Sequence, residues 1–310
     1  MSGPVLVTGA GGFVGAAVVR RLAADGIETV ALVRDAARAP RLDGLRGRVR
    51  LVEAELADAE ALLEALRAVR PKACLHLAAG GAVAGRDQLE SLLAVNTLAT
   101  ARLACELAEL GCERLVTAGS SSEYGPVAGA MAEALLPQPD DIYGVSKLAG
   151  GLLARALAAQ AGMQSLHLRI FSAYGPGEDR RRLVASVAER LLAGRPVELT
   201  PGAQVRDFVY VDDVASAFAR ALRCQASGVS LNVGSGRETS VRELCLLLCE
   251  LAGADPALLR FGALPYRHGE RFSWRADTRA AERLLGWRAT TSLRDGLAQT
   301  IAALRVEAAA

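Results

Sequence analysis

Close to its amino terminus the sequence reads Thr8-Gly9-Ala10-Gly11-Gly12-Phe13-Val14-Gly15, between an apolar run at residues 4–8 and a helical pattern at residues 12–24. Glycines spaced GxxGxxG permit a tight turn and bring backbone N–H groups and a helix amino terminus against a diphosphate. A glycine-rich turn alone is weak evidence, but this one has the strand–turn–helix context that a dinucleotide site requires. We therefore expect cofactor contacts at Gly9, Gly12, Phe13, Val14 and Gly15.

Short apolar runs alternate with helical patterns through the first half of the chain. Strands are expected at residues 4–8, 29–33, 49–52, 73–78, 115–118 and 165–170, and helices at residues 12–24, 59–69, 89–110 and 143–160. Strands without polar alternation are typical of parallel sheets covered on both faces. The pattern predicts an α/β fold with a Rossmann-like doubly wound sheet at residues 1–173. Longer Pro/Gly-rich loops predict a smaller ligand-binding region at residues 174–310, with some chain crossing back to the main sheet.

The composition excludes several classes of protein. Of 310 residues 51% are hydrophobic, and the net charge is only +2, which disfavours nucleic-acid or membrane-surface binding. The six cysteines show no metal-ligand spacing, so we expect reduced thiols and no metal. We find no signal peptide and no apolar run of the roughly 20 residues that a membrane helix needs, so we expect a cytoplasmic protein.

The end of the second expected strand bears on the choice of cofactor. An NAD site generally places Asp or Glu there to bind the ribose hydroxyls. Here Val33 is followed by Arg34, a guanidinium that suits a 2′-phosphate through charge-assisted hydrogen bonds. The sequence favours NADP(H). The alternative is NAD(H), with Asp35 as the ribose ligand and Arg34 as a surface charge.

Tyr143 and Lys147 lie four residues apart at the start of an expected helix, so both side chains can face one cleft. A phenol has a pKa near 10, and a neighbouring cation lowers it towards the range useful for proton transfer. Only Lys72 and Lys147 are lysines among 36 basic residues, which adds weight to the pair. The segment Ser120-Ser121-Ser122-Glu123-Tyr124-Gly125 follows the fifth expected strand. One of its hydroxyls could bind the reacting oxygen, although most serines of such turns bond their own backbone.

Together these motifs resemble the extended short-chain dehydrogenase/reductases that act on nucleotide sugars, over nearly the whole chain. Further motifs carry the resemblance: His76-Leu77-Ala78-Ala79, Asn96, Leu168-Arg169-Ile170-Phe171, Tyr174-Gly175-Pro176-Gly177, Val205-Arg206-Asp207-Phe208, Asn232-Val233-Gly234-Ser235-Gly236, residues 266–270, Ala276-Asp277 and Leu285-Gly286-Trp287. The resemblance implies a nucleotide-diphosphate sugar as the substrate, bound by the C-terminal region.

The resemblance also implies roles for single residues. Ser120, Tyr143 and Lys147 would be catalytic, and the last two would also contact the cofactor. Further cofactor contacts would be Glu55, Leu56, Leu77, Ala78, Ala79 and Asn96. Substrate contacts would be Ser121, Ser172, Arg206 and Arg267, with the two arginines on the diphosphate. Many members have Asn at the place of Ser172, which leaves the contacts there open.

Two enzymatic activities and one non-catalytic function fit the sequence. Ser121-Ser122 replaces the Asp-Glu pair with which dehydratases move protons, so dehydration is disfavoured. Arg34 slightly favours NADPH-dependent reduction at C4 of a 4-keto-6-deoxyhexose nucleotide. The alternative is a 4-epimerase that retains NAD, and a minor alternative is a non-catalytic dinucleotide-binding protein. The resemblance further implies a homodimer built on the helices at residues 89–110 and 143–160.

Overall fold

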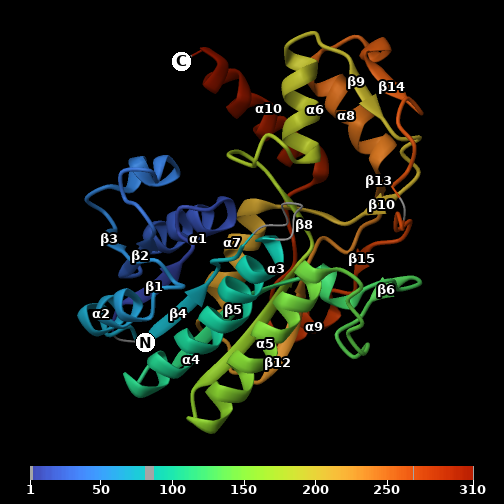
Figure 1. Ribbon diagram of the computed structural model, residues 1–310. Coiled ribbons are helices and arrows are strands. Elements are labelled where there is room, and N and C mark those ends of the chain that lie inside the picture. Colours follow the sequence, from blue (N-terminus) through green and yellow to red (C-terminus); the bar gives the residue numbers. More distant parts are fainter. Residues whose placement is uncertain (1–2, 81–86, 268, 310) are drawn as a thin grey trace.

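The computed structural model describes residues 3–80, 87–267 and 269–309 (Figure 1). Its main sheet has seven parallel strands in the order β3-β2-β1-β4-β5-β7-β12. Their bounds are β1 (Val5–Thr8), β2 (Thr29–Val33), β3 (Arg50–Glu53), β4 (Ala73–His76), β5 (Arg114–Ser120), β7 (Gln164–Ile170) and β12 (Val229–Val233). The strand order reverses between β1 and β4, where doubly wound sheets form a ligand crevice at their carboxyl ends. The predicted Rossmann-like fold is confirmed.

Helices cover both faces of this sheet. One face carries α1 (Phe13–Ala24), α7 (Val211–Ala221) and α9 (Arg279–Leu285), and the other carries α2 (Ala59–Val69), α4 (Thr100–Glu109) and α5 (Ile142–Gln160). Successive strand residues alternate between the two layers: Val7 packs with Phe218 of α7, whereas Leu6 packs with Leu103 of α4. This double burial explains the strands' lack of polar residues.

One predicted helix, at residues 89–110, differs from the structure. It consists of α3 (Asp87–Leu92), a π-helical segment η2 (Leu93–Ala99) and α4. The π segment contains Asn96, and a side chain at Gly150 of α5 would lie 2.0 Å from the Asn96 carbonyl oxygen. Short π-helical segments inside α-helices often mark functional sites, but the spacing of hydrophobic residues in the sequence does not reveal them. The other predicted strands and helices match within two residues at each end.

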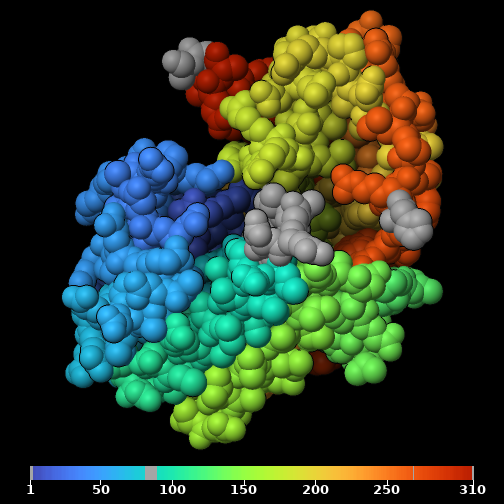
Figure 2. All heavy atoms as spheres, in the orientation of Figure 1, coloured from blue at the N-terminus to red at the C-terminus, as the bar shows by residue number. Residues whose placement is uncertain are grey.

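The carboxyl-terminal part forms a second, smaller core above the sheet's carboxyl edge (Figures 1 and 2). It contains α6 (Leu183–Leu192), α8 (Val241–Ala252) and α10 (Leu293–Ala309), with the parallel pair β9 (Val197–Leu199) and β14 (Leu259–Phe261). Short pairs join the two parts: β8 (Ser172–Tyr174) with β11 (Phe208–Tyr210), β10 (Val205–Arg206) with β13 (Thr239–Ser240), and β6 (Ala130–Met131) with β15 (Arg275–Ala276). Short 3₁₀ turns are η1 (Pro40–Leu45), η3 (Ser121–Tyr124) and η4 (Pro256–Leu258).

The chain crosses between the two parts several times after residue 174. The elements α7, β12 and α9 pack on the main sheet, while α6, α8 and α10 build the smaller core. Trp287, which is buried, donates its indole N–H to Ser216 Oγ at 2.8 Å and so anchors the segment after α9 on α7. Within residues 3–80, 87–267 and 269–309, we find no helix with the length and apolar character of a membrane span.

Candidate active site

The turn between β1 and α1 leaves the first N–H groups of α1 open. Gly9 has a φ of +65°, and a Cβ atom there would lie 2.5 Å from the Ala78 backbone nitrogen. A Cβ atom at Gly15 would lie 2.1 Å from the Gly9 carbonyl oxygen, which also accepts the Gly12 N–H at 2.9 Å. Gly12 provides no side-chain cap, so the helix amino terminus suits a diphosphate. The other contacts predicted for this turn, Phe13 and Val14, begin α1 and are half-buried.

The structure distinguishes two arginines that follow β2. Arg38 pairs with Asp35 at 3.6 Å, and the Asp35 carboxylate also accepts the Arg38 N–H at 3.2 Å. Arg34 is exposed, and among the residues that the structure describes it has no hydrogen-bonded or charged partner. The Asp35 carboxylate is therefore engaged by its own turn, whereas the Arg34 guanidinium is exposed to solvent.

A third arginine, Arg41, connects the glycine turn to the smaller part of the molecule. Its Nε donates to the Gly177 carbonyl oxygen at 3.0 Å, and its Nη1 donates to the Gly11 carbonyl oxygen at 3.3 Å. Arg41 therefore has a structural role in holding the two sides of the cleft together.

The remaining predicted cofactor contacts lie along the same carboxyl edge. Glu55 is exposed and Leu56 buried after β3, whereas Leu77 and Ala78 are half-buried and Ala79 exposed after β4. Asn96 is buried; its Oδ1 accepts the Gly80 N–H at 2.8 Å and its Nδ2 donates to Ser146 Oγ at 3.0 Å. Asn96 thus ties the segment after β4 to the helix that carries Tyr143.

The structure brings together Ser120, Tyr143 and Lys147, the three residues that the sequence predicts to be catalytic, and they are called the catalytic trio from here on. Ser120 ends β5, while Tyr143 and Lys147 occupy the first turns of α5, whose amino terminus is capped by Asp141. Burial raises the pKa of Tyr143, and the charges of Glu123 and Asp141 add to this rise, whereas Arg182 and the Ser120 side chain lower the pKa. The expectation that Lys147 brings the phenol pKa down is therefore wrong for this structure, because burial outweighs the nearby positive charge. Burial also lowers the pKa of Lys147 to about 8, although Glu123 opposes this. Lys147 lies one helical turn after Tyr143 on α5, and with a pKa of about 8 it is mostly an ammonium group at neutral pH.

Two predicted substrate contacts lie beside the trio. Ser121 is buried at the start of η3, directly after Ser120. Ser172 is half-buried at the start of β8, and its N–H donates to the Asp207 carbonyl oxygen at 3.0 Å. Ser121 follows β5 and Ser172 follows β7, so both residues lie at the carboxyl edge of the sheet, below the smaller carboxyl-terminal part.

The two predicted diphosphate ligands come from the smaller part. Arg206 donates from Nη2 to Glu270 Oε1 at 2.5 Å, and its guanidinium lies 5.7 Å from the Trp274 ring centroid. Arg267 is exposed, and its carbonyl oxygen accepts the Glu270 N–H at 3.0 Å. Glu270 therefore links the segments of both arginines. Residues 81–86 and His268, which belongs to the motif at residues 266–270, lie outside the described residues.

The sequence model of the NAD dependent epimerase/dehydratase family matches residues 5–234. The chain belongs to this family. It is 34% identical over 308 residues to UDP-glucose 4-epimerase of Mycolicibacterium smegmatis, covering 96% of both chains. A structure of MoeE5 in complex with UDP-glucuronic acid and NAD is 37% identical, with a TM-score of 0.88 and 98% and 100% of the two chains covered.

The epimerase/dehydratase family also includes reductases. The chain is 31% identical over 267 residues to dTDP-4-dehydro-6-deoxy-D-allose reductase of a Streptomyces species, covering 80% of this chain and 81% of the relative. The predicted resemblance to extended short-chain dehydrogenase/reductases is thus confirmed. The protein is an enzyme of the group that contains nucleotide-sugar epimerases, dehydratases and reductases.

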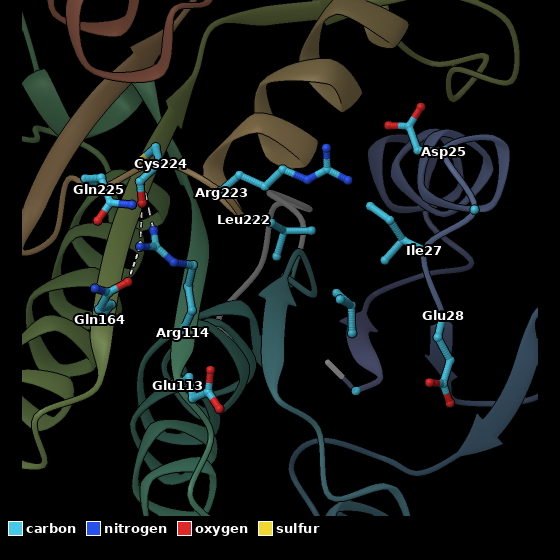
Figure 3. Close-up of a pocket in the computed structure, with 13 residues that line it drawn as sticks. Asp25, Ile27, Glu28, Glu113, Arg114, Gln164, Leu222, Arg223, Cys224 and Gln225 are labelled. Atoms are coloured by element: carbon cyan, nitrogen blue, oxygen red, sulfur yellow. Dashed lines mark hydrogen bonds between the residues drawn. The ribbon is translucent and has the colours of Figure 1, made fainter. Parts of the chain in front are cut away.

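A cavity of about 740 Å³ lies at the amino-terminal end of the sheet's strands, opposite the end that carries the catalytic trio (Figure 3). Val5, Arg114 and Gln164 are the first residues of β1, β5 and β7, and all three line it. The Arg114 guanidinium donates to the Gln164 side chain and to the Cys224 carbonyl oxygen. Since family members of this fold bind ligands at the carboxyl ends of the strands, this cavity is separate from the catalytic trio.

Sequence reasoning missed a buried charged group behind Ser120. Glu123 is fully buried, and it contacts His167 and Arg169 from β7. A signal was present, because two charged or titratable residues interrupt the apolar run 166–170 of a central strand. Their partner lies 44 and 46 positions away in the sequence, so the pattern could not identify it.

Proposed function

We propose that this enzyme is a nucleotide-sugar 4-epimerase. The observation that carries the proposal is that the Ser120 side chain lies close enough to Tyr143 to act on its phenol, one helical turn from buried Lys147. Ser121 and Ser122 lie next to Ser120, where a dehydratase would need acidic groups. The sequence alone favours a reductase slightly; the relatives of nearly full length, which include a UDP-glucose 4-epimerase and an NAD complex, support the epimerase.

In the proposed reaction Tyr143, as phenolate, takes the proton from the C4 hydroxyl of the sugar and later returns it to the C4 oxygen. Ser120 holds that oxygen by a hydrogen bond. The positive charges of Arg182 and Lys147 stabilise the phenolate against the effect of burial, which favours the neutral phenol. The glycine turn and the open amino terminus of α1 fit a dinucleotide diphosphate. When bound, its nicotinamide supplies a hydride acceptor and donor at C4. Arg206 and Arg267 would hold the sugar-linked diphosphate.

The deciding experiment uses the purified full-length protein. Bound cofactor is identified by absorbance and mass, and the protein is then incubated with UDP-glucose or UDP-glucuronic acid. We expect retained NAD and conversion to the C4 epimer, followed by proton NMR, with no net consumption of cofactor. Failure to convert any nucleotide sugar, with cofactor bound, would contradict the proposal.

We further propose that the sugar carries a carboxylate at C6, as in UDP-glucuronic acid. Arg182 precedes α6, its Nε lies 3.3 Å from Glu178 Oε1, and its charge lowers the pKa of Tyr143. Because its charge acts on the Tyr143 phenol and its side chain is exposed, we expect the Arg182 guanidinium to reach a carboxylate close to C4. The support from a relative is the MoeE5 complex with that nucleotide sugar.

Arg182→Ala should therefore raise KM for UDP-glucuronic acid about tenfold to a hundredfold, the range for loss of a charge-assisted hydrogen bond. KM for UDP-glucose should change little, which makes that sugar the internal control. Arg181→Ala is a matched control, because Arg181 is exposed and pairs with Asp179 instead. Equal losses for both sugars, or the same effect from Arg181→Ala, would disprove the carboxylate contact.

A second candidate function is NADPH-dependent reduction of a 4-keto-6-deoxyhexose nucleotide, which the exposed and unengaged Arg34 favours. Arg34→Ala should then weaken NADPH binding tenfold or more while leaving NADH binding unchanged, because only NADPH carries the 2′-phosphate. Arg38→Ala serves as the control, since Arg38 is paired with Asp35. Equal NADPH binding by Arg34→Ala and wild type would remove the support for NADP(H), and with it the reductase.

We also propose that the enzyme is a homodimer. Exposed apolar side chains lie on neighbouring helical segments: Leu93 and Leu98 on η2, and Val145, Leu152 and Leu153 on α5. A second copy of the chain would cover this surface.

A further inference from the structure

We propose that Glu123 is a positioning residue, whose buried carboxylate fixes the turn behind Ser120 and is itself held by His167 and Arg169. The proposal rests on the proposed function, because it assigns Glu123 its role relative to the catalytic trio.

Glu123 closes the turn that follows β5. Its Oε1 accepts the Ser120 N–H at 2.8 Å, and Ser120 Oγ accepts the Ser122 N–H at 3.1 Å. These reciprocal bonds form a capping box at the start of η3. Since Ser120 Oγ already accepts a hydrogen bond from the backbone, its hydroxyl proton is left to point away from the turn, towards Tyr143 or the sugar oxygen. Glu123 thereby sets the direction of the Ser120 hydroxyl.

Two side chains of β7 hold the Glu123 carboxylate. His167 Nε2 lies 2.9 Å from Oε1, and Arg169 Nε donates to Oε2 at 2.8 Å. His167 Nδ1 lies 2.7 Å from Thr117 Oγ1 on β5. A fully buried carboxylate without hydrogen-bonding partners would strongly destabilise the folded state. His167 and Arg169 provide these partners for Glu123.

Two glycines provide the space for His167. A Cβ atom at Gly119 would lie 2.4 Å from His167 Nε2 and 2.6 Å from Glu123 Oε1. A Cβ atom at Gly151 of α5 would lie 2.4 Å from His167 Cε1. Neither glycine has a positive φ, so the backbone conformation does not require glycine at either position. Their presence indicates that the imidazole and the carboxylate are specific components of this site.

The Glu123 charge acts on both ionisable members of the trio. Burial alone would raise the pKa of Glu123, but the charges and hydrogen bonds of His167 and Arg169 lower it to about 2. Glu123 is therefore an anion at all working pH values. The Glu123 charge raises the pKa of Tyr143. It also raises the pKa of Lys147, but burial has the larger effect and lowers that pKa to about 8. The carboxylate thus favours the Lys147 ammonium at neutral pH.

Other charged groups also face the trio. Arg182 from the start of α6 lowers the pKa of Tyr143, and Asp141 at the start of α5 raises it. His76 at the end of β4 lies near Lys147; burial and then the Lys147 charge lower the pKa of His76 to about 3, so it is neutral. Of these groups, Glu123 acts on both Tyr143 and Lys147.

The test is a phenol titration of Glu123→Gln, followed by ultraviolet difference absorbance with Tyr143→Phe as the blank. Gln can still accept the Ser120 N–H but carries no charge. We expect the Tyr143 midpoint to move to lower pH, and the alkaline limb of kcat to move to lower pH as Lys147 loses its proton earlier. Glu133→Gln is the matched control, because this partly buried carboxylate bonds the Asn232 N–H at 2.8 Å instead. An unchanged midpoint in Glu123→Gln, or an equal shift in Glu133→Gln, would overturn the proposal.

Two further variants distinguish the position of the Glu123 carboxylate from its charge. Glu123→Asp keeps the anion but shortens its reach, so kcat should fall about tenfold to a hundredfold with KM little changed and the midpoint near that of wild type. His167→Gln removes one donor while Arg169 still holds the anion, and it should lower kcat in the same way. If Glu123→Gln does not fold, these two decide the question, and wild-type kcat in both contradicts the positioning role. The titration needs no substrate, so it distinguishes failure of this proposal from absence of nucleotide-sugar turnover.

Discussion

Tyr143→Phe is expected to reduce kcat by about a thousandfold while leaving cofactor binding and folding close to wild type. Removal of the phenol oxygen eliminates the group that exchanges a proton with the C4 oxygen of the sugar. The rest of the ring keeps its packing at the start of α5. The measurement is turnover of UDP-glucose or UDP-glucuronic acid at saturating substrate, with cofactor content and thermal midpoint recorded on the same preparation.

Tyr124→Phe is the matched control for this loss. Tyr124 is also a buried tyrosine near Ser120, but its hydroxyl donates to Asn232 Oδ1 at 2.7 Å and not to the reacting oxygen. Its loss should affect stability by about 1 kcal/mol, with kcat nearly preserved. Full turnover by Tyr143→Phe would show that Tyr143 is not the proton-transfer group, whereas no turnover by wild type with cofactor bound would support the non-catalytic alternative. An equal fall in both variants would mean that the loss reflects folding and not proton transfer.

The catalytic trio could be predicted because its signals are local. Tyr143 and Lys147 are four residues apart on one helix, and Ser120 ends a strand whose apolar run is obvious. Helix and strand geometry therefore place these side chains at the same sheet edge without knowledge of tertiary contacts. The glycine turn is local for the same reason.

Other parts of the site depend on contacts between distant segments. Arg206 pairs with Glu270 across 64 positions, and Glu123 meets Arg169 across 46. The spacing of residues within one helix or strand cannot identify pairs that lie so far apart in the sequence. Only the folded structure reveals them. The π-helical segment around Asn96 was also unpredictable, because its apolar pattern is compatible with an ordinary α-helix.

Asp207 illustrates an intermediate case. The sequence marked it only through the motif that it shares with the family. In the structure its buried carboxylate accepts the Ser235 N–H at 2.6 Å, the Gly236 N–H at 2.9 Å and the Ala276 N–H at 3.0 Å. It therefore joins β11 to the loop after β12 and to β15, next to Arg206, which the sequence predicts to bind the diphosphate. A motif can thus identify an important position before its physical reason is known.

The glycine turn leads to the second large effect, which we expect from Gly15→Ala. A methyl group there would lie 2.1 Å from the Gly9 carbonyl oxygen, and backbone atoms cannot rotate away as a side chain can. Either α1 or the turn must move, which displaces the N–H groups that face the cofactor diphosphate. We expect dinucleotide affinity to fall about a hundredfold, measured by titration calorimetry on cofactor-free protein.

Gly11→Ala provides a strict control from the same turn, because its Cβ atom would meet the Ala39 side chain at 3.7 Å and the Val33 side chain at 3.8 Å, which are ordinary contacts. Gly11 lies outside the GxxGxxG positions that the sequence selected, so the two variants test the spacing itself. Cofactor affinity should survive Gly11→Ala and be lost in Gly15→Ala. If both variants bind equally well, close approach of the helix to the turn is not what creates the dinucleotide site. If both lose binding, the turn is intolerant of any side chain, and the three spaced glycines have no special role.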